Sequence, residues 1–166
     1  MKNNIQLRVI SRSAEQTVAL GESLGRHLRG GEVIDLVSDL GGGKTTLTRG
    51  LANGAGSSNH VASPTFTMSK TYDSGALRIH HFDFYRLEEA GIMANELAEI
   101  IGQDSDIVII EWSDIVQHVL PDVRLTIRIT QTGEDTRQFD LTFPQQYLYM
   151  LKEAPYSSSS ETVVNI

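Results

Sequence analysis

The distribution of apolar residues predicts a set of strands along the chain. Residues 33–37 are mostly apolar and residues 106–112 have an unbroken apolar centre, and both are typical of strands that are buried on both faces of a parallel sheet. Residues 65–86 and 123–143 each hold two strand-like runs around a turn that contains glycine, and each is expected to form a hairpin. The short apolar run 5–10 is expected to be an edge strand.

Helical periodicity separates these strands. Leucines recur every four residues from Leu20 to Leu28, so an amphipathic helix is expected to run as far as Gly30. Ser13 has the form of its N-cap, with Gln16 reaching back in a capping box. Further helices are expected at residues 45–52, 87–101, 113–121 and 145–152. Helices that alternate with buried strands predict an α/β fold in three layers, with a mainly parallel sheet and antiparallel hairpin additions.

Composition narrows the class of protein. The chain has 166 residues and no cysteine, which excludes disulfides, thiolate metal sites and cysteine nucleophiles. Its formal charge of −7 disfavours tight unaided binding of nucleic acid. No run is long enough to cross a bilayer and the first fifteen residues lack a secretory signal, so a cytoplasmic protein is expected. Residues 1–154 are expected to form a single domain, and residues 155–166 a disordered Ser-rich tail.

A glycine-rich segment follows the first buried strand and opens the next helix. From Gly41 to Thr46 it reads Gly-Gly-Gly-Lys-Thr-Thr, in the strand–loop–helix context that a phosphate-binding loop requires. Glycines let backbone N–H groups approach phosphate oxygens, while Lys44 is expected to reach the β- and γ-phosphates and Thr45 to bind Mg²⁺. The full pattern asks for glycine where Ser38 stands. This serine is expected either to adopt an unfavourable backbone conformation or to shift the start of the loop.

Two carboxylates stand at expected strand ends, where open α/β sheets place their sites. Glu111 follows an apolar strand, an arrangement that suits a carboxylate contacting Mg²⁺ directly or through water. Asp83 shares a strand face with His81 and Tyr85, because side chains alternate with a period of two. The adjacent pair of His80 and His81 is equally consistent with ordinary polar surface, and no transition-metal site is inferred from it.

Four short motifs follow one another in a fixed order, at Asp39–Thr46, Ser63–Phe66, His81–Arg86 and Ile110–Trp112. In this order they resemble the TsaE (YjeE) family, the small ATPase of bacterial tRNA threonylcarbamoyladenosine synthesis. The resemblance covers about residues 5–130. The family usually has glycine at position 38 and alanine at position 42. In P-loop NTPases a segment placed like Ser63–Thr67 often senses the γ-phosphate.

The resemblance implies a P-loop NTPase fold and slow, Mg²⁺-dependent hydrolysis of ATP. It also implies two partners that resemble TsaD and TsaB, with tRNA contacted only through the complex during modification of adenosine 37, and no membrane. The catalytic residues that it implies are Lys44, Asp83 and Glu111, with Mg²⁺ at Thr45 and Glu111. The nucleotide-binding residues that it implies are Ser13, Leu40, Gly41, Gly42, Gly43, Lys44, Thr45, Thr46 and Trp112.

Two other functions stay open. One is a small P-loop phosphotransferase, although no separate acceptor-binding domain fits into 166 residues. The other is a nucleotide-dependent scaffold in which Ser38 has weakened hydrolysis but not binding. A glycine-rich turn with an incidental lysine is the alternative that involves no nucleotide. The chain lacks an Asn-Lys-x-Asp sequence, the usual guanine-reading element, and this favours ATP over GTP.

Overall fold

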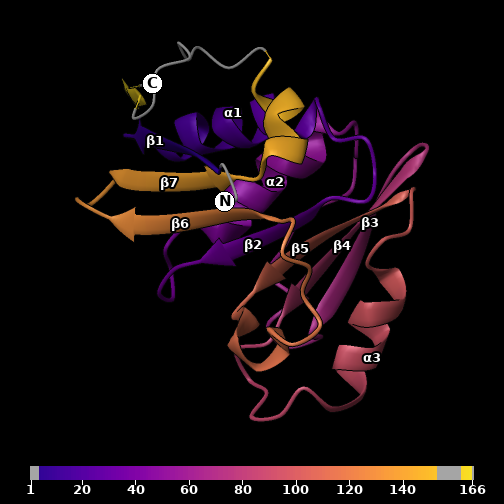
Figure 1. Cartoon of the computed structure of the whole chain (residues 1–166). Helices are drawn as coiled ribbons and strands as arrows, with labels where there is room; N and C mark the ends of the chain where they lie inside the picture. Colours follow the sequence, from indigo (N-terminus) through magenta and orange to yellow (C-terminus); the bar gives the residue numbers. More distant parts are fainter. Residues whose placement is uncertain (1–3, 153–161, 166) are drawn as a thin grey trace.

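The computed structural model describes residues 4–152 and 162–165. Its eight strands form one mixed sheet in the order β3-β4-β5-β2-β6-β7-β1-β8 (Figure 1). The strands are β1 (Ile5–Ser11), β2 (Val33–Val37), β3 (Ser69–Ser74), β4 (Leu77–Asp83), β5 (Asp106–Glu111), β6 (Leu125–Gln131), β7 (Arg137–Phe143) and β8 (Thr162–Asn165). The helices are α1 (Ala14–Gly25), α2 (Lys44–Gly54) and α3 (Gly91–Ile100), with two 3₁₀ helices, η1 (Ser113–Val116) and η2 (Gln145–Leu151).

The centre of the sheet is parallel. β4, β5, β2 and β6 are neighbours and all pair in parallel. The predicted hairpins, β3–β4 and β6–β7, add antiparallel strands on either side, and β1 pairs antiparallel with β7. β1 was predicted to be an edge strand, but it has a neighbouring strand on each side, because it pairs with β8 as well as with β7.

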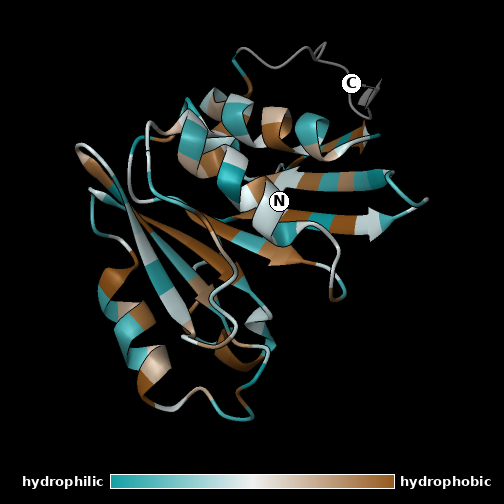
Figure 2. Cartoon of the chain, turned by 180° about the vertical axis from the view of Figure 1, so that it is seen from behind, coloured by the Kyte–Doolittle hydropathy of each residue, from teal (hydrophilic) through white to brown (hydrophobic). Residues whose placement is uncertain are grey.

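Each face of the sheet carries its own hydrophobic core. Along β5, Ile107 and Ile109 belong to the core that includes the buried side chains of α1 and α2. Val108 and Ile110 belong to the other core, which includes the buried side chains of α3. This division follows from the alternation of side chains along a strand. It creates three layers, and hydrophobic residues are concentrated in the central strands between the helices (Figures 1 and 2).

Helices α1 and α2 meet in direct backbone contact. A Cβ atom added at Gly21 would lie 2.5 Å from the carbonyl oxygen of Leu47, and one at Gly50 would lie 2.2 Å from that of Val18. No side chain fits at either position, so α2 packs closely against α1. Because Lys44 is the first residue of α2, this contact also fixes where the helix presents its N-terminal end.

Two predicted helices are shorter than expected. α1 ends at Gly25 rather than near Gly30, because the following residues form i→i+3 hydrogen bonds up to Leu28, which nevertheless stays buried. α3 begins at Gly91 rather than at Leu87. The φ angle of Gly91 is 49°, and this left-handed conformation does not continue a right-handed helix.

The C-terminal part of the chain also differs in detail from the prediction. The helices expected at 113–121 and 145–152 are the shorter 3₁₀ segments η1 and η2. Within the tail predicted to be disordered, Thr162–Asn165 form β8, whereas the remainder of residues 155–166 lies outside the described residues. Within residues 4–152 and 162–165, no helix has the length and apolar character needed to span a membrane.

Candidate functional site

The loop between β2 and α2 turns through glycines in a backbone conformation that other residues avoid. Gly41 has a φ angle of 72° and Gly43 one of 105°. A Cβ atom added at either glycine would meet no atom within 4 Å, so open space lies beside the backbone. A loop of this kind at a helix N-terminus can place several N–H groups around an anion. The geometry therefore fits a phosphate group.

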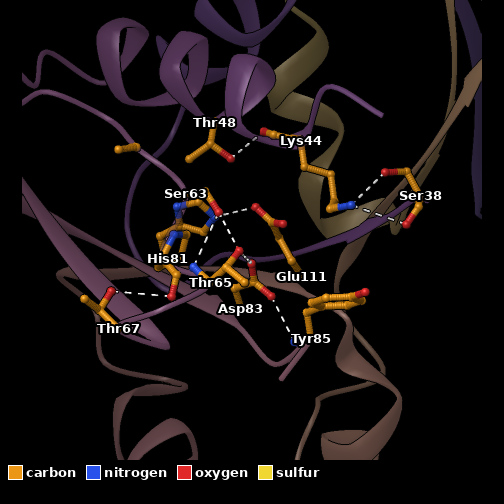
Figure 3. A network of polar contacts seen from close by, with 12 residues as sticks. Ser38, Lys44, Thr48, Ser63, Thr65, Thr67, His81, Asp83, Tyr85 and Glu111 are labelled. Atoms are coloured by element: carbon orange, nitrogen blue, oxygen red, sulfur yellow. Dashed lines mark hydrogen bonds and ion pairs between the residues drawn. The ribbon is translucent and has the colours of Figure 1, made fainter. Parts of the chain in front are cut away.

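Lys44 is folded back onto this loop. Its side chain is buried, and its ammonium group donates to Ser38 O at 3.3 Å and to Ser38 Oγ at 2.9 Å (Figure 3). It also donates to Asp39 O at 3.0 Å. Burial lowers the pKa of Lys44, and the negative charges of Glu111 and Asp83 partly oppose this shift. A phosphate oxygen that binds Lys44 would have to replace one or more of the three acceptors.

Ser38 occupies the space that the missing side chain of Gly42 leaves. A Cβ atom added at Gly42 would lie 2.4 Å from Ser38 Oγ and 2.8 Å from Ser38 Cβ. Among the described non-glycine residues only Met68 and Trp112 have positive φ angles, so Ser38 is not in a left-handed conformation. The two departures from the expected loop pattern, at positions 38 and 42, are therefore adjacent in space and complementary in size.

Asp83 and Glu111 end neighbouring strands. The parallel register of β4 and β5 places them opposite each other, and both side chains are buried. By the period of two they lie on the same sheet face as Ile79 and Ile109, which belong to the core beneath α1 and α2. The fold therefore brings both carboxylates to the face from which α2 presents Lys44.

Asp83 holds the segment predicted to act as a switch. Its Oδ2 accepts a hydrogen bond from Thr65 Oγ1 at 2.6 Å, and its Oδ1 accepts one from Tyr85 N at 2.9 Å. The Thr65 hydroxyl also lies 2.7 Å from Ser63 Oγ. The segment Ser63–Thr67 is thereby tied to the end of β4 through a carboxylate, as Figure 3 shows.

Glu111 contacts His81, a residue whose sequence context was equally consistent with ordinary polar surface. His81 is 0% exposed, and its Nε2 lies 2.8 Å from Glu111 Oε1. The reading as ordinary polar surface is therefore wrong for His81, while the less buried His80 contacts Asp106 at 2.9 Å. One feature of the sequence could have indicated this burial: side chains alternate along a strand, so His81 lies on the same face as Asp83. In the described part of the chain, no group of three or more His, Cys, Asp or Glu side chains could hold a metal ion.

Trp112 completes the wall of the site. It follows Glu111 with a φ angle of 56°, so the chain turns sharply at the end of β5. The centroid of its indole ring lies 4.9 Å from Lys44 Nζ and 4.9 Å from the ring centroid of Tyr85. The indole therefore contacts a cation and a second aromatic ring beside the glycine loop.

These groups line one cavity of about 320 Å³. Its lining comprises the predicted residues Leu40, Gly41, Gly42, Gly43, Lys44, Thr45, Thr46, Asp83, Glu111 and Trp112, together with Ser63 and Thr65. Ser13 is not part of this lining, because it is the N-cap of α1 and its hydroxyl accepts the N–H of Gln16. Its predicted role in nucleotide binding stays a prediction.

A second cavity of about 370 Å³ is lined by residues 38–40 and Gly42 of the same loop. Residues 128–131 at the end of β6 form one of its walls, and Trp112 also lines it. Its lining includes none of Lys44, Asp83 and Glu111. The smaller cavity therefore holds the groups suited to phosphate chemistry, and it is the candidate functional site.

The central parallel strands, the three layers and the glycine loop from β2 into α2 define an α/β protein with the P-loop NTPase fold. The family model for "Threonylcarbamoyl adenosine biosynthesis protein TsaE" matches residues 11–139. The chain therefore belongs to the TsaE family, as the order of its four motifs predicts.

Individual relatives agree with this assignment. The chain is 35% identical over 142 residues to the tRNA threonylcarbamoyladenosine biosynthesis protein TsaE of Bacillus subtilis, covering 82% of this chain and 85% of that protein. The protein of the same name from Nostoc is 38% identical over 132 residues, covering 77% and 80%. The crystal structure of Bacillus subtilis YdiB superposes with a TM-score of 0.76 at 32% identity, covering 90% of this chain and 94% of that one. The predicted fold class is confirmed.

Proposed function

We propose that this protein is a Mg²⁺-dependent ATPase that supports the threonylcarbamoyl modification of adenosine 37 in tRNA through partner proteins. The observation that carries the proposal is the convergence of Lys44, Asp83 and Glu111 on one cavity beside the glycine loop. Phosphoryl transfer depends on positioning and on stabilising charge, and these residue types supply both. Membership of the TsaE family supports the link to tRNA threonylcarbamoyladenosine biosynthesis.

Binding and hydrolysis are assigned to different groups. The loop N–H groups and Lys44 bind the phosphates, and their contacts are made with the nucleotide in any state of the reaction. Mg²⁺, held by Thr45 and Glu111, would neutralise charge on the phosphate oxygens. Glu111 also accepts a hydrogen bond from the attacking water and orients it. Loss of Glu111 should therefore reduce hydrolysis far more than it reduces affinity.

Asp83 is assigned to the coupling between the cavity and the switch segment. The same carboxylate lines the cavity and holds Thr65 at 2.6 Å. A ligand that displaces Asp83 must therefore disturb the Thr65 contact and with it the conformation of residues 63–67. Such a coupling would give the ATP-bound and ADP-bound forms different affinities for a partner protein.

The rim of the cavity suits a protein partner. Leu40, Phe66 and Tyr85 are 62%, 78% and 45% exposed, and the guanidinium carbon of Arg86 lies 4.1 Å from the centroid of the Phe66 ring. Leu40 lines the cavity, Phe66 follows the lining residue Thr65, and the Tyr85 ring contacts the lining residue Trp112. Large exposed apolar side chains beside a site are typical of an interaction surface. Because the chain carries a formal charge of −7, direct binding of tRNA is disfavoured. We assign the rim to the TsaD-like and TsaB-like partners.

The test is phosphate release from Mg²⁺-ATP, with and without both partner proteins. Wild-type release should rise when the partners are added. Glu111→Gln should keep nucleotide affinity within about threefold and lose at least about 100-fold in hydrolysis, as expected for a group that acts in the transition state. Glu99→Gln, at an exposed carboxylate on α3, is the control and should match wild type.

The same experiment separates the other functions. Transfer of labelled phosphate to a small molecule would indicate a phosphotransferase, and nucleotide binding without release under any condition would indicate a scaffold. Asp83→Ala should still bind nucleotide but stop repeated rounds of tRNA modification. Salt-sensitive, submicromolar binding of tRNA by the isolated chain would contradict the indirect role assigned to tRNA.

A further inference from the structure

His81 is a buried polar residue to which the proposed chemistry gives no role. It lies on β4, two residues before Asp83, and is 0% exposed. A polar ring in such a place must find hydrogen-bond partners, because burying it without them costs free energy. Both of its ring nitrogens have a polar neighbour in the structure.

The first neighbour is the carboxylate at the end of β5. His81 Nε2 lies 2.8 Å from Glu111 Oε1, and because an ionised carboxylate only accepts hydrogen bonds, Nε2 is the donor. This bond engages one oxygen of Glu111, whose side chain also lines the candidate cavity. Glu111 can therefore be held from behind through Oε1 while it acts in the cavity through Oε2.

The second neighbour leads toward the switch segment. His81 Nδ1 lies 3.4 Å from the hydroxyl oxygen of Tyr72, and that hydroxyl donates its one hydrogen to the carbonyl oxygen of Ala62 at 3.1 Å, so the contact with His81 is a hydrogen bond in which Nδ1 is the donor. Ala62 directly precedes Ser63, the first residue of the segment 63–67. A chain of polar contacts thus runs from Glu111 through His81 and Tyr72 to the backbone at the start of this segment.

We propose that His81 is a positioning residue, which fixes the orientation of Glu111 for hydrolysis and links that carboxylate through Tyr72 to the switch segment. The proposal rests on the proposed function, because it assigns His81 to the hydrolytic step. It adds a second connection between the sheet and the segment, separate from the contact between Asp83 and Thr65. The competing explanation is that His81 only fills space in the core.

Paired substitutions separate these explanations. His81→Gln can keep an N–H donor near the position of Nε2, whereas His81→Met fills a similar volume without one. With partners present, His81→Met should lower kcat by about 10- to 100-fold, the effect typical of residues that orient a metal-linked ligand, with KM nearly unchanged. His81→Gln should recover most of kcat. Ile79→Met, at a fully buried position on the same face of β4, is the packing control and should keep kcat.

Tyr72→Phe tests the outer part of the chain of contacts. Removing one neutral hydroxyl should lower kcat by about two- to tenfold. Combined with His81→Met it should add little further loss, because both variants interrupt the same connection. Equal losses in His81→Met and His81→Gln, wild-type kcat in His81→Met, or fully additive effects of Tyr72→Phe would each overturn the proposal.

A measurement without nucleotide keeps this proposal independent of the proposed function. Nuclear magnetic resonance of the histidine ring nitrogens should show Nε2 of His81 carrying hydrogen, and Glu111→Gln should shift that signal while leaving those of His27 and His118 in place. Unchanged His81 signals in Glu111→Gln would refute the contact itself. If wild type releases no phosphate even with the partners while the spectrum behaves as expected, the proposed function fails and the link between His81 and Glu111 stands.

Discussion

Lys44 is the residue on which the candidate site depends most directly. Lys44→Ala should weaken nucleotide binding by about 2–3 kcal/mol, because a charge-assisted contact to phosphate is lost, and should abolish phosphate release. Calorimetric titration with ADP and a phosphate assay check both expectations. Arg49→Ala removes an exposed cation from the same helix and should change neither quantity. Wild-type phosphate release by Lys44→Ala would rule out this loop as the catalytic one.

Ser38 and Gly42 should behave as a pair. Gly42→Ala alone places a methyl group 2.4 Å from Ser38 Oγ, so the loop must distort and nucleotide affinity should fall. Ser38→Gly/Gly42→Ala removes the obstacle and should restore affinity, with a coupling of about 1–3 kcal/mol in a double-mutant cycle followed by ADP titration. Additive effects would show that the two positions do not share space.

The predictability of single residues depends on how local their partners are. Lys44 and Glu111 could be assigned from sequence because a loop and a strand end define them within a few residues. The contact between His81 and Glu111 joins residues 30 apart, and it exists because β4 and β5 pair in a particular register. No local pattern contains that register, so the sequence could place His81 on a face but not against its partner.

At the scale of elements, the contact between α1 and α2 is the feature most sensitive to substitution. Gly50→Ala would place a Cβ atom 2.2 Å from the backbone oxygen of Val18, which cannot rotate away as a side chain could. The helices must separate, and the free energy of unfolding should fall by about 1–3 kcal/mol, measured by urea denaturation. Gly133→Ala is the matched control, because its nearest contact is at 3.4 Å and it should be close to neutral.

Element types were predictable, but several boundaries were not. Strands β1–β7 and the three main helices follow from periodicity, which each segment carries in its own residues, whereas β8 lies in a segment predicted to be disordered. The start of α3 is set by the left-handed φ angle of Gly91, and the end of α1 by a tightened turn that keeps Leu28 buried. Both boundaries depend on the local conformation and packing of the backbone. The periodicity of apolar residues continues past each boundary and therefore does not reveal it.

For the whole molecule, the buried carboxyl of Asp35 gives a pH dependence of known sign. Burial raises the pKa of Asp35 above 3.8, although Ser113 and Arg124 lower it in part, and its Oδ1 has no hydrogen-bond partner among the described residues. The folded chain therefore holds this proton more tightly than the unfolded chain. The resulting stabilisation is complete below the unfolded pKa and is lost as the pH rises through the folded one.

Asp35→Asn should remove this dependence. The variant should be more stable than wild type at pH values above the folded pKa of Asp35, where wild type carries a buried charge, and its advantage should shrink as the pH falls through that pKa. Arg124 keeps its hydrogen bonds to Gln117 and Pro121 in the variant. Urea denaturation at several pH values gives the difference directly. An advantage that grows on acidification would reverse the assigned sign.

The order of the strands lay beyond what the sequence could provide. Alternating helices and buried strands predict the α/β class, but β5 lies between β4 and β2, and β2 is separated from β3, the next strand in the chain, by two others. Such an arrangement depends on which long-range pairings bury the most apolar surface together. The two cores on opposite faces of β5 are the outcome of that competition.

Trp112 gives the molecule an optical property. It is the one tryptophan of the chain, and its ring lies 4.9 Å from the ammonium group that is expected to move when phosphate arrives. Indole emission responds to nearby charge and to exclusion of water, so the tryptophan fluorescence of the protein, excited at wavelengths that its five tyrosines do not absorb, originates at its candidate site. Titration with ADP can therefore be followed without a label, and a change in emission that disappears in Trp112→Phe would locate its source. Light absorbed by this one indole reports on the place where the chemistry of the protein is expected to happen.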